Sequence, residues 1–235
     1  MPKAKLFLIP NVLSDRPVEH FFGKEVYNAI NSCNYFIVEH IREARRLLVK
    51  LGFKEKLEQI QFFELNKHTA EEEIAGFLAP AKKGENIGII SDAGCSGIAD
   101  PGAEIVAMAH QNNIKVVPLV GPSSILLALI SSGLGGQNFH FHGYIAKEGA
   151  QRSKEIKRME NSSANTTQIF METPFRNKKL LEDLLTTLSD NCKLCIACDI
   201  TADSEYIVTK TVANWKKTNI PELNKRPCIF LLRRN

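Results

Sequence analysis

The chain has 235 residues, of which 44% are hydrophobic and 24% are charged, and its formal net charge is +4. This composition excludes a disordered tail, a collagen-like chain and a disulfide-dense miniprotein, and the length suits one large domain or two of roughly 100 residues each. No apolar run approaches the roughly 20 residues that span a bilayer, and the N-terminus lacks the apolar stretch of a signal peptide, so we expect a cytoplasmic protein without membrane segments.

Strands and helices are expected to alternate along the first half of the chain. The apolar runs predict strands at 5–9, 35–38, 60–63, 86–90 and 114–119. Helices are predicted at 21–30, 41–51 and 123–132, with further helix starts at Thr69, before three glutamates, and at Pro101. This alternation favours an α/β fold with a largely parallel sheet.

The pattern starts again after the glycine-rich run at 133–136. Strands are predicted at 139–144, 168–171, 193–198, 205–209 and 228–232, and helices at 153–159 and 174–188. The last strands lack long helices between them, so we expect a mixed sheet there. The sequence therefore predicts two domains, residues 1–120 and 121–235, with the boundary near 118–123.

The charge is unevenly distributed between these parts. Residues 1–135 contain 14 Lys and Arg against 15 Asp and Glu, whereas residues 136–235 contain 16 against 11. The positive excess of the second part would suit an anionic partner, although an ordinary solvated surface gives the same count.

Two groups of side chains have a spacing that superficially resembles a metal site. Cys192, Cys195 and Cys198 fall on a predicted strand, which would point Cys195 away from the other two. His140 and His142 would share one face of another strand. In a cytosolic chain we expect the cysteines to be reduced thiols, and we expect no metal at either place.

The most informative segment follows the strand at 86–90. Residues 91–102 read Ser-Asp-Ala-Gly-Cys-Ser-Gly-Ile-Ala-Asp-Pro-Gly. In open α/β sheets, ligands bind at the carboxyl ends of strands, and small residues let a ligand approach the backbone closely. The chain has no Walker or dinucleotide motif, so the residues alone leave two readings open, a ligand-binding loop and a tight structural turn.

Six segments in a fixed order carry a further signal. They include Leu-Phe-Leu-Ile-Pro at 6–10, Val-Glu-His-Ile-Arg at 38–42, the loop at 91–102, Val-Gly-Pro-Ser-Ser at 120–124, Phe-His-Gly-Tyr at 141–144 and Met-Glu-Thr-Pro-Phe-Arg at 171–176. In this order they resemble the tetrapyrrole methylase superfamily of S-adenosylmethionine-dependent methyltransferases. The resemblance covers essentially the whole chain and is nearest to the branch that methylates ribose 2′-hydroxyls of small-subunit ribosomal RNA.

This resemblance implies a fold, a cofactor and a partner. It implies two α/β domains with the cofactor cleft between them, a homodimer, S-adenosylmethionine as cofactor, no metal, and ribosomal RNA or the small ribosomal subunit as the partner. The residues that it assigns to the cofactor are Pro10, Ala93, Gly94, Cys95, Ile98, Ser123, Ser124, Met171, Asp199, Ile200 and Thr201.

Candidate catalytic and substrate-binding residues come from the same motifs. Three acids end predicted strands, where one of them would remove a proton from the acceptor or would simply cap a helix or pair with an arginine: Glu39, Asp92 and Glu172. Four arginines are expected to contact substrate phosphates: Arg42, Arg45, Arg152 and Arg176.

Several positions depart from the family pattern. The opening loop at 10–15 is shorter and lacks the family's glycine, and Cys95-Ser96 stands where Thr-Pro is common. His40 replaces an acid, and Phe175 replaces a histidine. Two alternatives to an RNA methyltransferase therefore stay open: a methyltransferase for a small acceptor such as a tetrapyrrole, and a cofactor-binding paralogue without activity.

Overall fold

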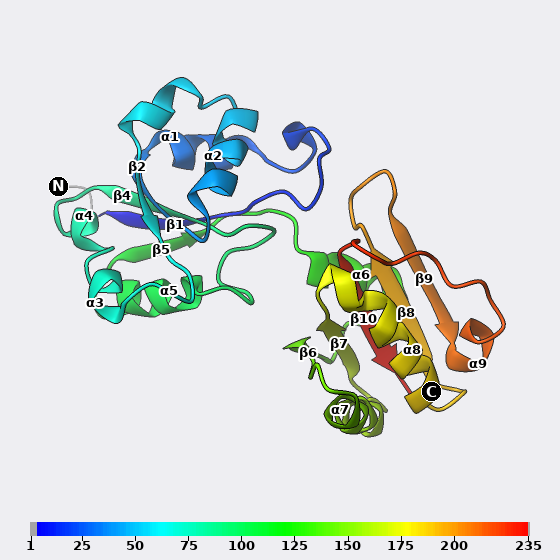
Figure 1. Cartoon of the computed structure of the whole chain (residues 1–235). Coiled ribbons are helices and arrows are strands. Elements are labelled where there is room, and N and C mark those ends of the chain that lie inside the picture. Colours follow the sequence, from blue (N-terminus) through cyan, green and yellow to red (C-terminus); the bar gives the residue numbers. More distant parts are fainter. Residues whose placement is uncertain (1–3, 235) are drawn as a thin grey trace. The chain divides into compact units, whose positions relative to one another are not determined.

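The computed structural model describes residues 4–234 and divides into two compact units between Ser123 and Ser124. Each unit is built on its own five-stranded sheet with helices packed against it (Figure 1). The prediction of an α/β fold is confirmed. The structure places the long helix from Ser124 in the second unit.

The first unit contains a parallel sheet in the order β3-β2-β4-β1-β5. The strands are β1 (Lys5–Ile9), β2 (Cys33–Val38), β3 (Gln61–Glu64), β4 (Asn86–Ile90) and β5 (Lys115–Pro118). Every pairing in this sheet is parallel, as the alternation of strands and helices predicts. The carboxyl ends of all five strands therefore lie along one edge.

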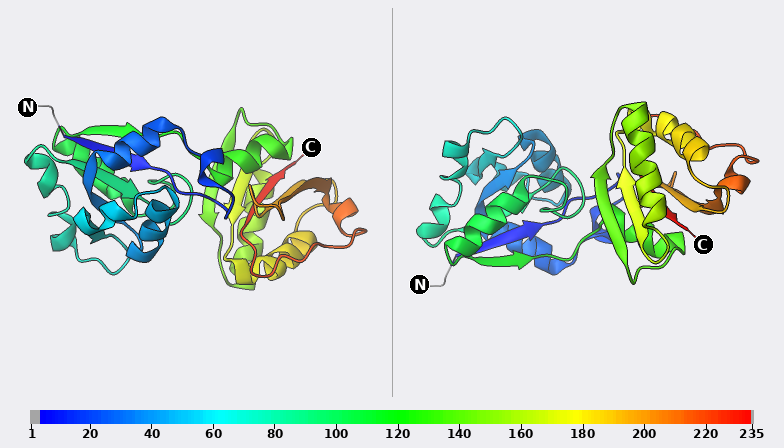
Figure 2. Two further views of the ribbon diagram at one scale, coloured as in Figure 1. Left: turned by 90° about the horizontal axis from the view of Figure 1, so that it is seen from above. Right: turned by 90° about the horizontal axis from the view of Figure 1, so that it is seen from below.

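Helices cover both faces of this sheet. On one face lie η1 (Val18–His20), α1 (Lys24–Asn31), α2 (Ile41–Lys50) and η2 (Glu55–Gln59), and on the other α3 (Glu71–Ile74), α4 (Ala79–Lys82) and α5 (Gly102–Gln111). In Figure 1, α1 and α2 lie above the sheet, and α3 and α5 lie below it. Figure 2 shows the first unit from these two sides, so that α1 and α2 face the viewer in one panel and α5 in the other.

Helix α2 has one apolar and one basic side. Leu47, Leu48 and Leu51 are at most 6% exposed, which confirms the face that their spacing predicts. Arg42 and Arg45 lie on the exposed part of the helix. Burial of the leucines therefore fixes the helix so that its arginines face solvent.

The strands β1 and β4 are neighbours, yet the helices that follow them cover opposite faces. Helix α1 follows β1 and packs on one side, whereas α5 follows β4 and packs on the other. The chain thus diverges from a topological switch point between the carboxyl ends of β1 and β4. Open α/β sheets bind ligands at such a point because the diverging connections leave a crevice there.

The second unit contains a mixed sheet in the order β6-β7-β10-β8-β9. The strands are β6 (Phe139–Tyr144), β7 (Thr167–Met171), β8 (Lys193–Cys198), β9 (Tyr206–Thr211) and β10 (Cys228–Arg233). The pair β6–β7 is parallel and the other pairs are antiparallel, so the predicted mixed sheet is confirmed.

Helices also cover this second sheet. Helices α7 (Gly149–Asn161), α8 (Asn177–Thr187) and α9 (Val212–Trp215) share one apolar core with β7, β8 and β10. Helix α6 (Ser124–Ser132) has its buried residues outside that core and contacts β8, β9 and β10. The short helix η3 (Pro174–Arg176) joins β7 to α8.

The helix predicted to start near Thr69 is present, with three glutamates in its first turn, but Thr69 does not cap it. The hydroxyl of Thr69 donates to the carbonyl of Glu64 at 3.1 Å and accepts the backbone N–H of Asn66 at 2.9 Å. Helix α3 begins after Ala70 and has no side-chain cap. The hydroxyl is therefore used by the preceding turn, which competes with capping for the same oxygen.

The cysteines and histidines lie as their strand spacing predicts. Cys192 and Cys198 belong to the core shared with α7 and α8, whereas Cys195 is buried outside that core. His140 and His142 stack with ring centroids 4.1 Å apart. Within residues 4–234, no three His, Cys, Asp or Glu side chains are placed to hold a metal ion. None of the helices in this described range has both the length and the apolarity to cross a bilayer.

Candidate functional site

The carboxyl edge of the first sheet brings two of the predicted acids together. Glu39 directly follows β2, and Asp92 follows the neighbouring strand β4. The backbone N–H of Asp92 donates to a carboxylate oxygen of Glu39 at 3.0 Å. Since both positions are fixed by paired strands, the two acids are held in place by the sheet itself.

His40 joins these acids. Its Nδ1 lies 2.7 Å from Oδ2 of Asp92, and both side chains are partly open to solvent. Burial raises the pKa of Glu39, partly offset by the hydrogen bond from Asp92. The hydrogen bond and the charge of Asp92 raise the pKa of His40. The strand edge thus carries a carboxylate with a raised pKa next to a hydrogen-bonded imidazole–carboxylate pair.

Asn11 connects the loops that follow β1 and β4, at the topological switch point between these strands. Its side-chain amide donates to the carbonyls of Ser91 and Asp92, both at 3.0 Å, and its backbone forms an antiparallel bridge with Gly94. Asn11 as a whole is 4% exposed. The loop after β1 is therefore fastened to the loop after β4 at the place where a ligand is expected.

Ser96 lies at one of the positions that depart from the family pattern. Its buried hydroxyl accepts the backbone N–H of Ser91 at 3.2 Å and lies 3.2 Å and 3.3 Å from the carbonyls of Ile9 and Ile89. One hydroxyl proton serves one of these carbonyls at a time. Ser96 therefore connects this loop to the ends of β1 and β4.

Asp100 shapes the rest of the loop. Its two carboxylate oxygens each accept a backbone N–H at 2.7 Å, from Gly97 and Gly102. Gly94 and Gly97 have φ values of 67° and 90°, a left-handed conformation that favours glycine. The sequence of small residues is thus required by the backbone path, and the same path leaves Ala93 and Ile98 exposed.

The loop after β5 packs against the start of the site. An added Cβ on Gly121 would lie 2.2 Å from Cβ of Pro10, so the glycine is needed for this approach. The thiol of Cys95 lies 3.4 Å from the carbonyl oxygen of Pro122. Pro10, Gly94 and Cys95, three of the residues predicted to bind the cofactor, are therefore in one cluster of loops.

Ser123 and Ser124 continue from this cluster. Ser123 is buried and is the last residue of the first unit, and Ser124 is the first residue of α6. Their predicted contact with a cofactor stays a prediction.

A groove lies at the carboxyl edge of the first sheet, beside helix α2. It has a volume of about 1230 Å³ and is lined by residues 11–15, by 92–93, and by 41–43, 45–47, 49 and 50 of α2. We call it the α2 groove. Arg42 and Arg45, two of the predicted substrate-binding residues, share it with Asp92 and Ala93. The structure therefore places predicted acceptor-side and cofactor-side residues next to one another.

The remaining cofactor candidates lie along one edge of the second sheet. Met171 ends β7 beside Ile229 of β10, and β8, on the other side of β10, ends next to Asp199. Asp199 and Thr201 have φ values of 49° and 73°, which non-glycine residues rarely adopt, and Ile200 between them is buried. This turn places three of the predicted residues at the same end of the sheet as Met171, with β10 between them.

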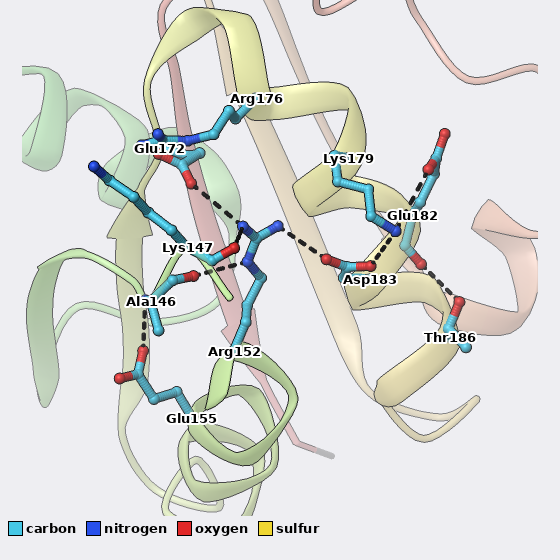
Figure 3. Close-up of polar contacts among 10 residues, drawn as sticks. All are labelled: Ala146, Lys147, Arg152, Glu155, Glu172, Arg176, Lys179, Glu182, Asp183 and Thr186. Atoms are coloured by element: carbon cyan, nitrogen blue, oxygen red, sulfur yellow. Dashed lines mark hydrogen bonds and ion pairs between the residues drawn. The ribbon is translucent and has the colours of Figure 1, made fainter. Parts of the chain in front are cut away.

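Arg152 is held inside the second unit (Figure 3). It is 2% exposed, and its guanidinium donates to Asp183 at 2.9 Å and to the carbonyls of Ala146 and Lys147. A phosphate contact requires an accessible guanidinium. The structure thus contradicts the expected substrate role of Arg152 and gives it a structural one, which its position in the sequence does not reveal.

Glu172 is part of the same buried network. It is 3% exposed, lies 3.9 Å from Arg152, accepts the N–H of Thr173 at 2.7 Å and pairs with Arg176 at 2.5 Å. Burial by itself would raise the pKa of Glu172, but the hydrogen bonds and the arginines outweigh it and lower the pKa. A buried carboxylate with a lowered pKa is a poor proton acceptor, so the structure favours Glu39 over Glu172 as a base.

Sequence reasoning missed Asn11 and the structural role of Ser96. Both residues lie in loops that follow a buried strand, the same pattern by which the loop at 91–102 was chosen. For Asn11, the informative pattern is a polar residue directly after Pro10, which ends the strand at 5–9. For Ser96 no local pattern exists, because its partners at Ile9 and Ile89 come from two different strands.

Several proteins of known name are similar to this chain. Ribosomal RNA small subunit methyltransferase I of Synechocystis sp. is 36% identical over 143 residues, which are 61% of this chain and 50% of that protein. The proteins of the same name from Haemophilus influenzae and Bacillus subtilis are each 29% identical, over 80% and 88% of this chain and 64% and 68% of their own lengths. The chain thus spans half to about two thirds of the length of these relatives.

Solved structures share the fold. A structure titled as the methyltransferase CobJ has a TM-score of 0.65 at 14% identity and covers 98% of this chain and 94% of its own. The uroporphyrin-III-C-methyltransferase of Thermus thermophilus has a TM-score of 0.58 at 14% identity, with the same coverage.

A family model matches most of the chain. The model described as "Tetrapyrrole (Corrin/Porphyrin) Methylases" matches residues 24–215, which is well over half of the chain. The match includes β2, the loop after β4, and most of the second sheet. The chain therefore belongs to the tetrapyrrole (corrin/porphyrin) methylase family.

Proposed function

We propose that this chain is an S-adenosylmethionine-dependent methyltransferase that acts on a ribose 2′-hydroxyl of small-subunit ribosomal RNA. The names of its relatives and its family support this function. The structural observation that carries it is the meeting of Glu39 and Asp92 at a strand edge that is shared with the exposed arginines of α2.

The residues near the switch point fit the cofactor. Gly121 lets its loop pack directly on Pro10, and Gly94 has a left-handed φ of 67°, so these two loops bring backbone rather than side chains to this place. Ile98, at 49% exposed, offers apolar surface in the same loop. When bound, S-adenosylmethionine supplies a methyl group on a positively charged sulfur, so that a neutral thioether leaves. A solved neighbour with a TM-score of 0.55 is described as complexed with S-adenyl homocysteine.

Glu39 is the proposed general base. Methyl transfer to a hydroxyl requires that the hydroxyl proton leave, and a carboxylate whose pKa is raised by burial accepts a proton more readily than an ordinary glutamate. The N–H of Asp92 orients the carboxylate, and the pair of Asp92 with His40 holds that N–H in place. The main contribution of such a site is to position the acceptor, which is a proximity effect.

Transfer of a labelled methyl group tests this function. The purified chain is incubated with labelled S-adenosylmethionine and with small ribosomal subunits from a strain that lacks the corresponding gene. We expect label in the ribosomal RNA, and mass spectrometry of nuclease fragments should place it on a ribose. Subunits from the parent strain are the control, because their site is already methylated. Absence of label in both would contradict the RNA assignment.

The same experiment separates the two alternatives. Label that passes to a tetrapyrrole and not to RNA would identify a small-acceptor enzyme. Tight binding of S-adenosylmethionine in a calorimeter, without transfer to either acceptor, would identify a paralogue that has lost catalysis. Absence of any binding would contradict all three functions.

Two further properties are proposed with this function. A ribosomal RNA substrate would place the enzyme in the cytoplasm, and the family resemblance implies a homodimer. Light scattering on the purified chain measures its mass directly and tests the dimer. The location of the cofactor between the two domains likewise stays a prediction, which a structure with bound S-adenosylhomocysteine would test.

A further inference from the structure

The α2 groove is lined by two segments of the first unit. One is helix α2 and the other is the segment of residues 11–15, and Asp92 and Ala93 of the loop after β4 complete the lining. Asn11 fastens the segment at its start through Ser91 and Asp92, and Asp15 fastens its end through an ion pair with Lys50 at 2.7 Å. Both ends of this segment are therefore held.

The charges in the groove are not equally available. Arg46 binds both carboxylate oxygens of Glu43, at 2.7 Å and 3.0 Å, and Lys50 is paired with Asp15. Within residues 4–234, Arg42 and Arg45 have no carboxylate partner. The guanidinium of Arg45 instead lies over the ring of Phe62, 5.6 Å from its centroid. Two cations of the groove are thus left to interact with a ligand.

Arg42 and Arg45 are also placed so that one extended ligand would contact both. They are three residues apart on α2, so their side chains emerge on one side of the helix about one turn apart. The N-terminus of α2 directly follows His40, and its C-terminus carries Lys50. A ligand along the helix would therefore pass the arginines on its way from Lys50 to the acids.

The size of the groove indicates the kind of ligand. Its volume of about 1230 Å³ exceeds the roughly 300–1,000 Å³ that is usual for small-molecule pockets. Val12, Leu13 and Ile41 add partly buried apolar surface to its lining. An extended polyanion with apolar groups fits a wide groove of this kind better than a compact acceptor does.

We infer that the α2 groove binds the single-stranded RNA segment that flanks the methylated nucleotide, with phosphates on Arg42 and Arg45. This inference rests on the proposed function and adds the path of the substrate to it. RNA is recognised in sequence-specific fashion mostly in single-stranded regions, whose bases are free to contact protein side chains. The Asp15–Lys50 pair marks the end of the path that lies farther from Asp92.

The test compares two charge-reversal variants. R42E/R45E changes the groove, and K82E/K83E makes the same change of charge at two exposed lysines at the end of α4, outside the groove. Binding of a single-stranded RNA of about 12 nucleotides is measured by fluorescence anisotropy at several salt concentrations. Because each phosphate contact contributes roughly 0.7 to the salt slope for single strands, we expect R42E/R45E to lower the slope by about 1.4.

Further expected results follow from the same measurement. R42E/R45E should bind the RNA at least tenfold more weakly, whereas K82E/K83E should retain a binding constant close to that of the parent. D15N should release Lys50 and increase the slope by about 0.7, because one more cation becomes available. A duplex of the same length should bind more weakly than the single strand. R42Q/R45Q serves in place of the glutamate variant if that protein does not fold, as judged by circular dichroism.

The outcomes separate this inference from the function on which it rests. If R42E/R45E binds and methylates RNA as the parent does, the groove is not the RNA path, although the methyltransferase assignment stands. Equal losses in R42E/R45E and K82E/K83E would mean that net charge alone is responsible, which also overturns the inference. If the parent protein methylates no RNA, the proposed function fails. Preferential binding of the duplex would contradict the single-stranded substrate.

Discussion

The imidazole of His40 and the carboxylate of Asp92 form a hydrogen bond across two neighbouring strand ends, with 2.7 Å between Nδ1 and Oδ2. His40 is the residue that precedes α2, and Asp92 lies in the loop after β4. The pair therefore links the start of the basic helix to the loop that is proposed to bind the cofactor.

Removing the carboxylate of Asp92 should lower the pKa of His40. Asp92 stabilises the protonated imidazole, so the pair is complete below the raised pKa and is lost as the pH rises through it. We expect an NMR titration of D92N to show a lower pKa for His40 than the parent does. E64Q is the control, because Glu64 contributes less to this shift than Asp92 does. An unchanged pKa in D92N would contradict the pairing.

Substitution of Glu39 by glutamine should reduce methyl transfer and leave cofactor binding intact. Loss of a general base costs roughly 10²–10⁴-fold in rate. Because burial raises the pKa of Glu39, the parent's rate should increase with pH through that raised pKa, and E39Q should lose this increase. Single-turnover rates and calorimetry with S-adenosylmethionine measure the two effects.

The matched control for this variant is E64Q. Glu64 is the last residue of β3, the neighbour of β2, and so occupies a corresponding strand end. Its activity should remain near that of the parent. Equal activity of E39Q and the parent would exclude Glu39 as the base.

Replacing Gly121 by alanine should distort the loops around Pro10. The new Cβ would lie 2.2 Å from Cβ of Pro10, and a proline ring has little freedom to move. Overpacking of this kind typically costs about 1–3 kcal/mol. Thermal unfolding and cofactor binding should both be weakened. G149A is the control, since nothing lies within 4 Å of an added Cβ there, and a similar loss in both variants would argue against the clash.

Replacing Arg152 by methionine should destabilise the second unit. The change leaves two carbonyl oxygens without their donor and removes the cation that pairs with Glu172 and with Asp183. Breaking a buried ion pair by removing one partner costs about 3–5 kcal/mol. Urea unfolding should show this loss, whereas R158M, at an exposed position of the same helix, should unfold as the parent does. RNA binding by folded R152M should be unchanged, because the guanidinium does not reach solvent.

The sequence predicts the elements of this fold better than it predicts their partners. The parallel sheet follows from the alternation of strands and helices, and the apolar face of α2 follows from the spacing of its leucines. The order of the strands is a tertiary property. The sequence predicts that Glu39 and Asp92 each follow a strand. Only the pairing of β2 with β4 brings the two residues into contact.

Arg152 shows the limit most clearly. The sequence does not distinguish an arginine at the surface from an arginine in a buried network. Only the packing of α7 against α8 places Asp183 beside Arg152. Thr69 shows the same limit on a smaller scale. Its hydroxyl had two competing local partners, a turn and a helix start, and the structure uses the turn.

The environment of Cys95 provides a chemical probe of the proposed site. Five of the six cysteines are buried, and Cys95 alone is partly exposed, next to the carbonyl of Pro122. Burial raises the pKa of its thiol, so alkylation should be slow at neutral pH and faster in alkaline solution. A single modified cysteine, detected by peptide mass mapping, would then report through its labelling rate whether a small molecule has occupied the neighbouring loops.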